Sequence, residues 1–137
     1  MHYRLSVGVS RPKGKSCFVM ESKGKELNVK VQKTKSANVK GEILHILEVG
    51  LRACKSMVKH EDFLVIEIQN RHLQQWLDGL VEYKDYSEGL DRVFEVLETL
   101  DCRYKFSFNA NTYALEYLDK NDLTEVITGG SIADMFQ

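Results

Sequence analysis

The stretch Phe63–Ile68 (FLVIEI) constrains the fold most, because it is strand-like and apolar at every position except Glu67. A strand with apolar residues on both faces is typical of a central place in a sheet that is covered on both sides. It ends in Gln69 and Asn70, directly before an amphipathic helix pattern. Many α/β proteins keep functional residues at such a junction of strand and helix. The sequence therefore predicts a helix-covered sheet with a candidate site at this end.

Three strand patterns precede this run. The first alternates Leu5, Val7 and Val9 with small or polar residues, which is the period of a strand. Short turns that contain glycine, and in one case the only proline, separate the three patterns. The patterns cover 3–10, 16–22 and 27–34. They predict an antiparallel meander.

Helix patterns surround the central strand. Residues 38–58 carry apolar side chains at steps of three and four, with Ser36 or Asn38 as the N-cap. Gly50 inside this helix is expected to allow close packing against the sheet. Further elements are expected as a helix over 71–80, a helix capped by Ser87, a strand over 102–108 and a helix over 111–118. The resulting order is β-β-β-α-β-α-α-β-α in one domain, 1–137, with a short apolar tail at 131–137.

Bulk composition excludes several classes of protein. An apolar fraction of 43% and a charged fraction of 28% are ordinary for a globular chain and argue against disorder. No apolar run approaches the ~20 residues of a membrane span, and the first ten residues lack the pattern of a signal peptide. Cys17, Cys54 and Cys102 are widely spaced, which predicts reduced thiols and no zinc site. We expect a cytoplasmic protein without a membrane partner.

The two parts of the chain differ in charge. Residues 1–60 contain 13 Lys and Arg against 4 Asp and Glu, whereas residues 61–137 contain 6 against 16. Such asymmetry is typical of a surface for nucleic acid or for a charged partner, and it also arises when two solvated surfaces neutralise each other.

Three short motifs and the order of elements resemble the ribonuclease H-like fold along most of the chain. Glu42 in KGEILHILEVGL stands where the family writes A-E-L, and VIEIQNRHLQQWL places Gln69 at the Asp of T-D-S-x-x-V. NTYAL matches N-x-x-A-D but puts Leu115 at its Asp, and Gly8 falls where the first strand should carry an Asp. The resemblance implies a mixed α/β fold (α+β in the broad sense), with a five-stranded sheet in the order 3-2-1-4-5 and helices on both faces.

The resemblance also implies a chemistry that these positions do not support. Two-metal phosphodiester hydrolysis needs several carboxylates around two Mg²⁺ ions, and only Glu42 of the four expected acids is present. The interpretation is a degenerate scaffold: not an enzyme, without a metal or cofactor, acting as a binding or regulatory protein, including one of phage or mobile-element origin. The alternative is an active metal-dependent ribonuclease H-like nuclease whose acids lie at other positions.

Two further residues, Glu67 and His45, are candidate metal ligands. Glu67 shares a strand face with Gln69 and, together with Glu42, could hold one cation. The competing explanation is an acid at the rim of the sheet that pairs with a lysine. His45 lies one turn after Glu42, but no other ligand has suitable spacing, so a packed or surface histidine is the expectation.

Basic residues at the predicted hairpin ends and on the third strand are the candidates for partner binding. They could follow a phosphate backbone, or they could protect an edge strand from aggregation. Few aromatic residues accompany them, and the acidic helices after the central strand favour a protein partner over nucleic acid; self-association is left open. The candidates are Arg11, Lys13, Lys15, Lys23, Lys25 and Lys30, with Phe136 in the tail.

Overall fold

The computed structural model describes residues 1–35, 38–80, 85–121 and 127–128. It contains six strands and four helices within those ranges. The strands are β1 (His2–Ser10), β2 (Lys15–Ser22), β3 (Lys25–Lys33), β4 (Phe63–Ile68), β5 (Arg103–Phe108) and β6 (Ile127–Thr128). The helices are α1 (Val39–Lys55), α2 (Arg71–Leu77), α3 (Ser87–Thr99) and α4 (Tyr113–Lys120).

All six strands form one mixed sheet in the order β5-β4-β1-β2-β3-β6. The meander β1-β2-β3 is antiparallel, whereas β1 pairs with β4, and β4 with β5, in parallel. The predicted order 3-2-1-4-5 is confirmed. The two-residue strand β6 adds an antiparallel edge beside β3, which the sequence did not indicate.

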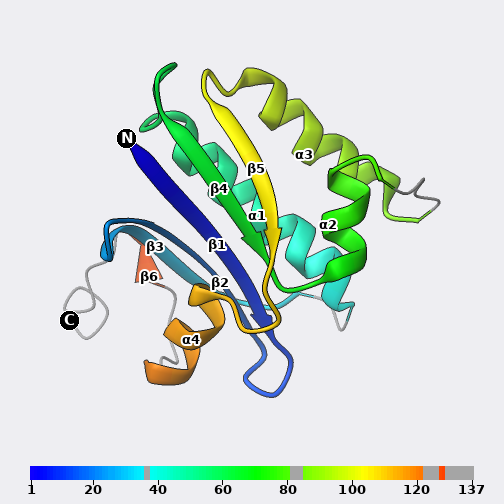
Figure 1. Ribbon diagram of the computed structural model, residues 1–137. Helices are drawn as coiled ribbons and strands as arrows, with labels where there is room; N and C mark the ends of the chain where they lie inside the picture. The colour runs from blue at the N-terminus through cyan, green and yellow to red at the C-terminus, as the bar shows by residue number, and fades with distance from the viewer. Residues whose placement is uncertain (36–37, 81–84, 122–126, 129–137) are drawn as a thin grey trace.

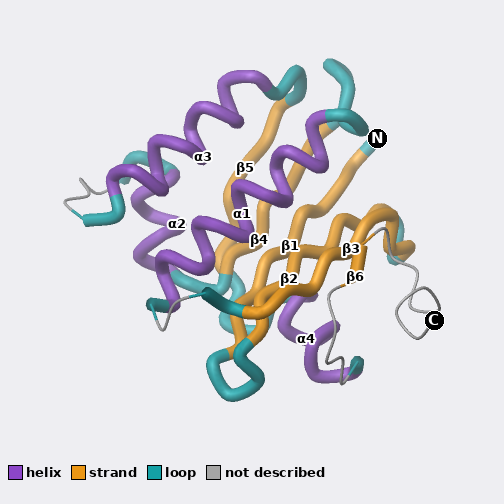
Figure 2. The backbone as a smooth tube through the Cα atoms, turned by 180° about the vertical axis from the view of Figure 1, so that it is seen from behind, coloured by secondary structure: helices purple, strands orange, loops and turns teal. Residues whose placement is uncertain are grey.

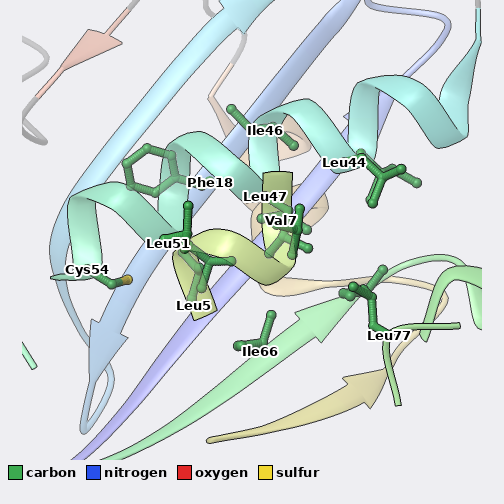
Figure 3. Packing of buried hydrophobic residues seen from close by; sticks show 14 of the residues in the cluster. Leu5, Val7, Phe18, Leu44, Ile46, Leu47, Leu51, Cys54, Ile66 and Leu77 are labelled. Carbon is green, nitrogen blue, oxygen red and sulfur yellow. The ribbon is translucent and has the colours of Figure 1, made fainter. Parts of the chain in front are cut away.

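Helices lie on both faces of the sheet, as predicted. Figure 2 shows α1, α2 and α3 together on one face, and Figure 1 shows α4 on the opposite face. The larger core lies between α1 and the sheet. There Leu5 and Val7 of β1 pack with Leu47 of α1, and all three are fully buried (Figure 3). A smaller cluster under α4 joins β2 and β3 to Ala114 and Leu118. Alternate side chains of a strand therefore point into two different cores, one on each face of the sheet.

Helix α1 begins and packs as its sequence predicts. The Asn38 side chain accepts a hydrogen bond from the backbone N–H of Gly41 and caps the helix. Gly50 lies directly on the sheet, where an added Cβ would be 3.0 Å from Cδ1 of Leu5 and 3.2 Å from Cγ of Phe18. The glycine therefore lets helix and sheet approach more closely than a larger residue would.

Two local expectations were wrong. Ser87 does not cap α3: the N-cap is Tyr86, which has a left-handed φ of 63° and makes no side-chain capping bond. Strand β4 is also not covered on both sides along its whole length, because Phe63 and Val65 are only half-buried on the face that carries α4. The covering helix reaches β1 and β2 but stops short of this half of the sheet (Figure 1).

The three cysteines are free thiols, as predicted. Burial raises the pKa of the Cys54 thiol to about 12 and moves the pKa of Cys17 upward as well, so both remain protonated at neutral pH. Within the part of the chain that the structure describes, no helix has the length and apolar character to cross a membrane.

Candidate functional site

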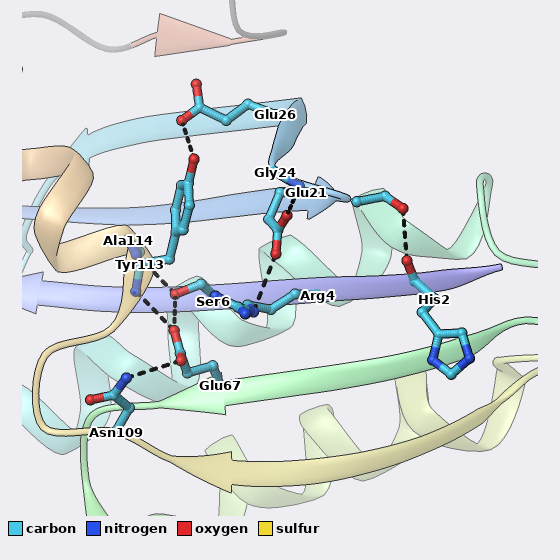
Figure 4. Close-up of polar contacts among 11 residues, drawn as sticks. His2, Arg4, Ser6, Glu21, Gly24, Glu26, Glu67, Asn109, Tyr113 and Ala114 are labelled. Atoms are coloured by element: carbon cyan, nitrogen blue, oxygen red, sulfur yellow. Dashed lines mark hydrogen bonds and ion pairs between the residues drawn. The ribbon is translucent and has the colours of Figure 1, made fainter.

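The parallel strands β1, β4 and β5 end at the same edge of the sheet, and α4 begins there. In open α/β sheets this edge is the usual place for a ligand. A buried polar cluster of the described residues centres on Glu67, the fifth residue of β4, which is 7% exposed. It faces the side of the sheet on which α4 lies (Figure 4).

Three donors bind the Glu67 carboxylate. The Ser6 hydroxyl and the backbone N–H of Tyr113 donate to Oε1 at 2.9 Å and 2.8 Å, and Asn109 Nδ2 donates to Oε2 at 3.2 Å. Tyr113 is the first residue of α4, so the helix N-terminus adds a favourable dipole to the carboxylate. The carboxylate is therefore a rigid anion that joins three elements.

Helix α4 is attached to β1 by its first turn. The Ser6 hydroxyl accepts from the backbone N–H of Ala114 at 2.9 Å while donating to Glu67. The Thr112 hydroxyl donates to the carbonyl of Val7 at 3.0 Å and accepts from the N–H of Leu115 at 3.2 Å, which caps the helix. The capping residue is thus Thr112, and the predicted helix start at 111 was too early.

The four positions suggested by the resemblance do not meet as a set of ligands. Gly8 lies against Leu115, since an added Cβ would be 2.8 Å from the Leu115 Cγ. The Gln69 amide binds both backbone groups of Val9, accepting from its N–H at 2.5 Å and donating to its carbonyl at 3.1 Å. Gln69 therefore continues the pairing of β4 with β1 beyond the end of the strand.

Glu42 occupies a separate environment in the first turn of α1. It is 4% exposed, and its Oε1 accepts from the backbone N–H of Lys35 at 2.6 Å. Its Oε2 is buried without a hydrogen-bond partner, which is rare for a carboxylate oxygen. Ser16 Oγ and Gln32 Nε2 are likewise buried without partners, and these two residues face each other across β2 and β3.

These residues do not fit a pair of metal ions held by the protein. No group of three or more His, Cys, Asp and Glu side chains lies close enough to hold a metal among the described residues. Three hydrogen bonds already use the oxygens of Glu67. The buried, unpaired Oε2 of Glu42 supplies one carboxylate ligand, which fits a single cation that takes its remaining ligands from water and substrate phosphates, as Mg²⁺ commonly does.

The basic residues predicted to bind a partner do not form one surface in the structure. The β1–β2 turn carries Arg11 and Lys13 at one end of the sheet, whereas the β2–β3 turn carries Lys23 at the opposite end. Lys13 is engaged, because its ammonium donates to the carbonyl of Leu118 at 2.7 Å. Lys15 Nζ is buried without a partner, and Phe136 lies outside the described residues. Lys25 and Lys30 lie at the start and in the middle of β3.

The sequence reasoning missed most of the hydrogen-bonded cluster. Ser6, Asn109 and Thr112 are ordinary polar residues without a motif, and only the fold brings them to Glu67. A signal was present for Ser6, because it lies on the face of the first strand opposite Leu5, Val7 and Val9, in a sheet expected to carry helices on both faces.

Comparison with known proteins gives structural neighbours. No family model matches the sequence, and no curated protein matches it closely enough to count as a relative. RNase H1 from the halophilic archaeon Halobacterium salinarum NRC-1 aligns with a TM-score of 0.61 at 14% identity, over 79% of this chain and 83% of the other. The chain has a ribonuclease H-like fold.

Two further neighbours agree. The N-terminal RNase H domain of a Mycobacterium tuberculosis protein, solved as a fusion with maltose-binding protein, aligns with a TM-score of 0.64 at 14% identity, over 91% of this chain and 100% of the other. LC11-RNase H1, solved in complex with an RNA/DNA hybrid, aligns with a TM-score of 0.61 at 9% identity, over 99% of each chain.

These neighbours correct one prediction. We expected that the chain is not an enzyme, because Gly8, Gln69 and Leu115 stand at positions of acids. That prediction is wrong, since the structures that share the fold are those of ribonuclease H enzymes.

Proposed function

We propose that the chain is a metal-dependent ribonuclease H-like nuclease that acts on nucleic acid. The observation that carries the proposal is the buried Oε2 of Glu42, which lies in the first turn of α1 and has no hydrogen-bond partner. The three structural neighbours, one of them solved with an RNA/DNA hybrid, support nucleic acid as the substrate class.

The residues of the chain have separate roles in this proposal. Glu42 would contact a divalent cation, which would neutralise phosphate charge and polarise the scissile group. Glu67 is a positioning residue: it binds Ser6 and the N-terminus of α4 and so keeps α4 against β1. The described residues contain no cluster of carboxylates that would hold a pair of ions.

A hydrolysis assay on a labelled RNA–DNA hybrid with Mg²⁺ or Mn²⁺ tests the proposal. We expect cleavage by the native protein and at least a hundredfold loss in Glu42→Gln, because an amide cannot supply the negative charge of the ligand. Glu88→Gln is the matched control, since Glu88 is also the acidic residue in the first turn of a helix but is exposed. Absence of cleavage by the native protein, or full activity in Glu42→Gln, would contradict the proposal.

A further inference from the structure

The face of the sheet that carries α4 is only half covered. Helix α4 packs on β1 and β2, and no other element of the described residues covers β4, β5 and the first residues of β1 on this face (Figure 1). On this open side Phe63 and Val65 of β4 are half-buried, and Arg103 and Lys105 of β5 are exposed. We call this surface the open face and define it by His2, Arg4, Phe63, Val65, Arg103 and Lys105.

The strand register arranges the open face in two rows. In the first row His2 pairs with Phe63, and Phe63 pairs with Arg103. In the second row Arg4 pairs with Val65, and Val65 pairs with Lys105. Directly paired residues of parallel strands project to the same side, so each row sets a cation beside an apolar side chain. The ring contact between His2 and Phe63, at 5.7 Å between centroids, confirms that they share a side.

A hollow of about 220 Å³ opens at the β1 side of these rows. Its lining includes His2, Arg4, Lys23 and Val65 together with the carboxylate of Glu21. Arg4 forms an ion pair with Glu21 at 3.2 Å, whereas no described carboxylate pairs with Lys23, Arg103 or Lys105. The open face therefore combines unneutralised positive charge with an aromatic and apolar floor.

We propose that the open face binds a single-stranded segment of nucleic acid. The bases would lie against His2 and Phe63, and the phosphates would contact Arg103 and Lys105. Proteins bind single strands through this combination, because every base can stack on a ring and every nucleotide carries a phosphate. A protein partner would not need aromatic rings beside cations, and charge complementarity favours the polyanion.

The open face leads to the polar cluster at the sheet edge. Two residues further along β4 and β5, Glu67 pairs with Ser107 on the same side of the sheet. A strand that follows β4 from Phe63 therefore arrives at Glu67 and the start of α4. The inference thus deepens the proposed function, on which it rests for the identity of the ligand, by naming the path of one strand along β4 to the edge of the sheet where α4 begins.

Binding of a fluorescent single-stranded 12-mer, measured by anisotropy in EDTA, tests the cationic part. We expect Arg103→Ala/Lys105→Ala to weaken binding at least tenfold and to lower the slope of log affinity against log salt by about 1.4, which is twice the ~0.7 expected per phosphate. Arg52→Ala/Lys55→Ala is the matched control, because it also removes one Arg and one Lys but from α1 on the opposite face. Equal losses in both variants would overturn the proposal.

The aromatic part has its own variant. Stacking contributes roughly 1 kcal/mol or more per base, so His2→Ala should weaken the 12-mer about fivefold or more without changing the salt slope. His2 is exposed, and thermal melting should confirm that the variant remains folded. Unchanged affinity of His2→Ala would contradict stacking of a base on His2. Tighter binding of a blunt DNA duplex than of the single strand would overturn the proposal.

Failure of this inference and failure of the nuclease proposal are distinguishable. EDTA prevents metal-dependent cleavage, so the binding assay gives the same result whether or not Glu42 holds a cation. Binding that depends on the open face in a protein that does not cleave a hybrid contradicts only the nuclease. Cleavage that survives Arg103→Ala/Lys105→Ala with unchanged KM contradicts only the open face.

Discussion

An added Cβ on Gly8 would lie 2.8 Å from Cγ of Leu115 and 3.0 Å from its backbone nitrogen. Strand β1 and helix α4 therefore approach so closely that no side chain fits at position 8 while Leu115 occupies its present place. The two positions, both compared above with acids of the ribonuclease H-like pattern, are here a complementary small and large pair.

This contact predicts that Gly8→Ala destabilises the protein by about 1–3 kcal/mol, the usual cost of overpacking a well-packed site. The backbone of α4 contributes to the clash, so a rotamer change of Leu115 alone cannot relieve it. Urea unfolding of Gly8→Ala, Leu115→Ala and the double variant forms a cycle. We expect Leu115→Ala to recover part of the loss, with a coupling of at least about 0.5 kcal/mol; strict additivity would contradict the contact.

Two glycines of α1 should respond in opposite directions to alanine. Gly50→Ala gains helix propensity but forces its Cβ to within 3.0 Å of Leu5, so we expect a net loss of about 1 kcal/mol. Gly41→Ala meets Asn38 only at an ordinary 3.7 Å and should gain up to about 1 kcal/mol. Thermal unfolding of both variants checks this, and a stabilised Gly50→Ala would refute the tight packing.

The fold could be predicted to the level of strand order because its signals are local and periodic. Alternation at Leu5, Val7 and Val9 and helical spacing over 38–58 follow from which side chains must be buried. The same reasoning placed the N-cap of α3 at Ser87 and missed Tyr86, because a left-handed residue before a helix leaves no compositional trace. The edge strand β6 was missed because two residues carry no period.

The site was less predictable, because its contacts are between residues far apart in sequence. Glu67 was identified as an acid on the correct strand face, but its three donors come from β1, the residue after β5 and α4. The open face could not be predicted from the charge balance of the two parts of the sequence. Arg103 and Lys105 lie in the acidic part of the sequence, whereas the register of β4 and β5 brings them together with Phe63 and Val65.

Glu67→Gln should be destabilising although it conserves shape. The amide retains one acceptor oxygen and turns an NH₂ group toward atoms that now donate to the carboxylate, such as the N–H of Tyr113. Leaving a buried donor unsatisfied costs about 1–3 kcal/mol. The control is Glu61→Gln, an exposed position in the turn before β4, for which we expect a change within about 0.5 kcal/mol. Equal stability of both variants in urea would show that Glu67 contributes little to the attachment of α4.

The phenol of Tyr113 should make folding stability sensitive to alkaline pH. Burial raises the pKa of Tyr113 from 10.0 to about 12, and the hydrogen bond to Glu26 at 2.9 Å adds to the shift. Between these values the unfolded chain loses the phenolic proton while the folded protein keeps it, so the free energy of unfolding falls as pH rises. The contribution is complete below about pH 10 and is lost as pH rises through about 12.

Tyr113→Phe isolates this dependence. The variant lacks the titrating group, so its free energy of unfolding should fall less steeply between pH 10 and 12 than that of the native protein. Cys54 and Tyr117, whose pKa values are also raised, are present in both proteins and cancel in the difference. Near pH 7 the variant should lose about 1 kcal/mol for the hydrogen bond to Glu26. Tyr104→Phe, at an exposed tyrosine, is the control and should follow the native curve; parallel curves for Tyr113→Phe and native protein would contradict the raised pKa.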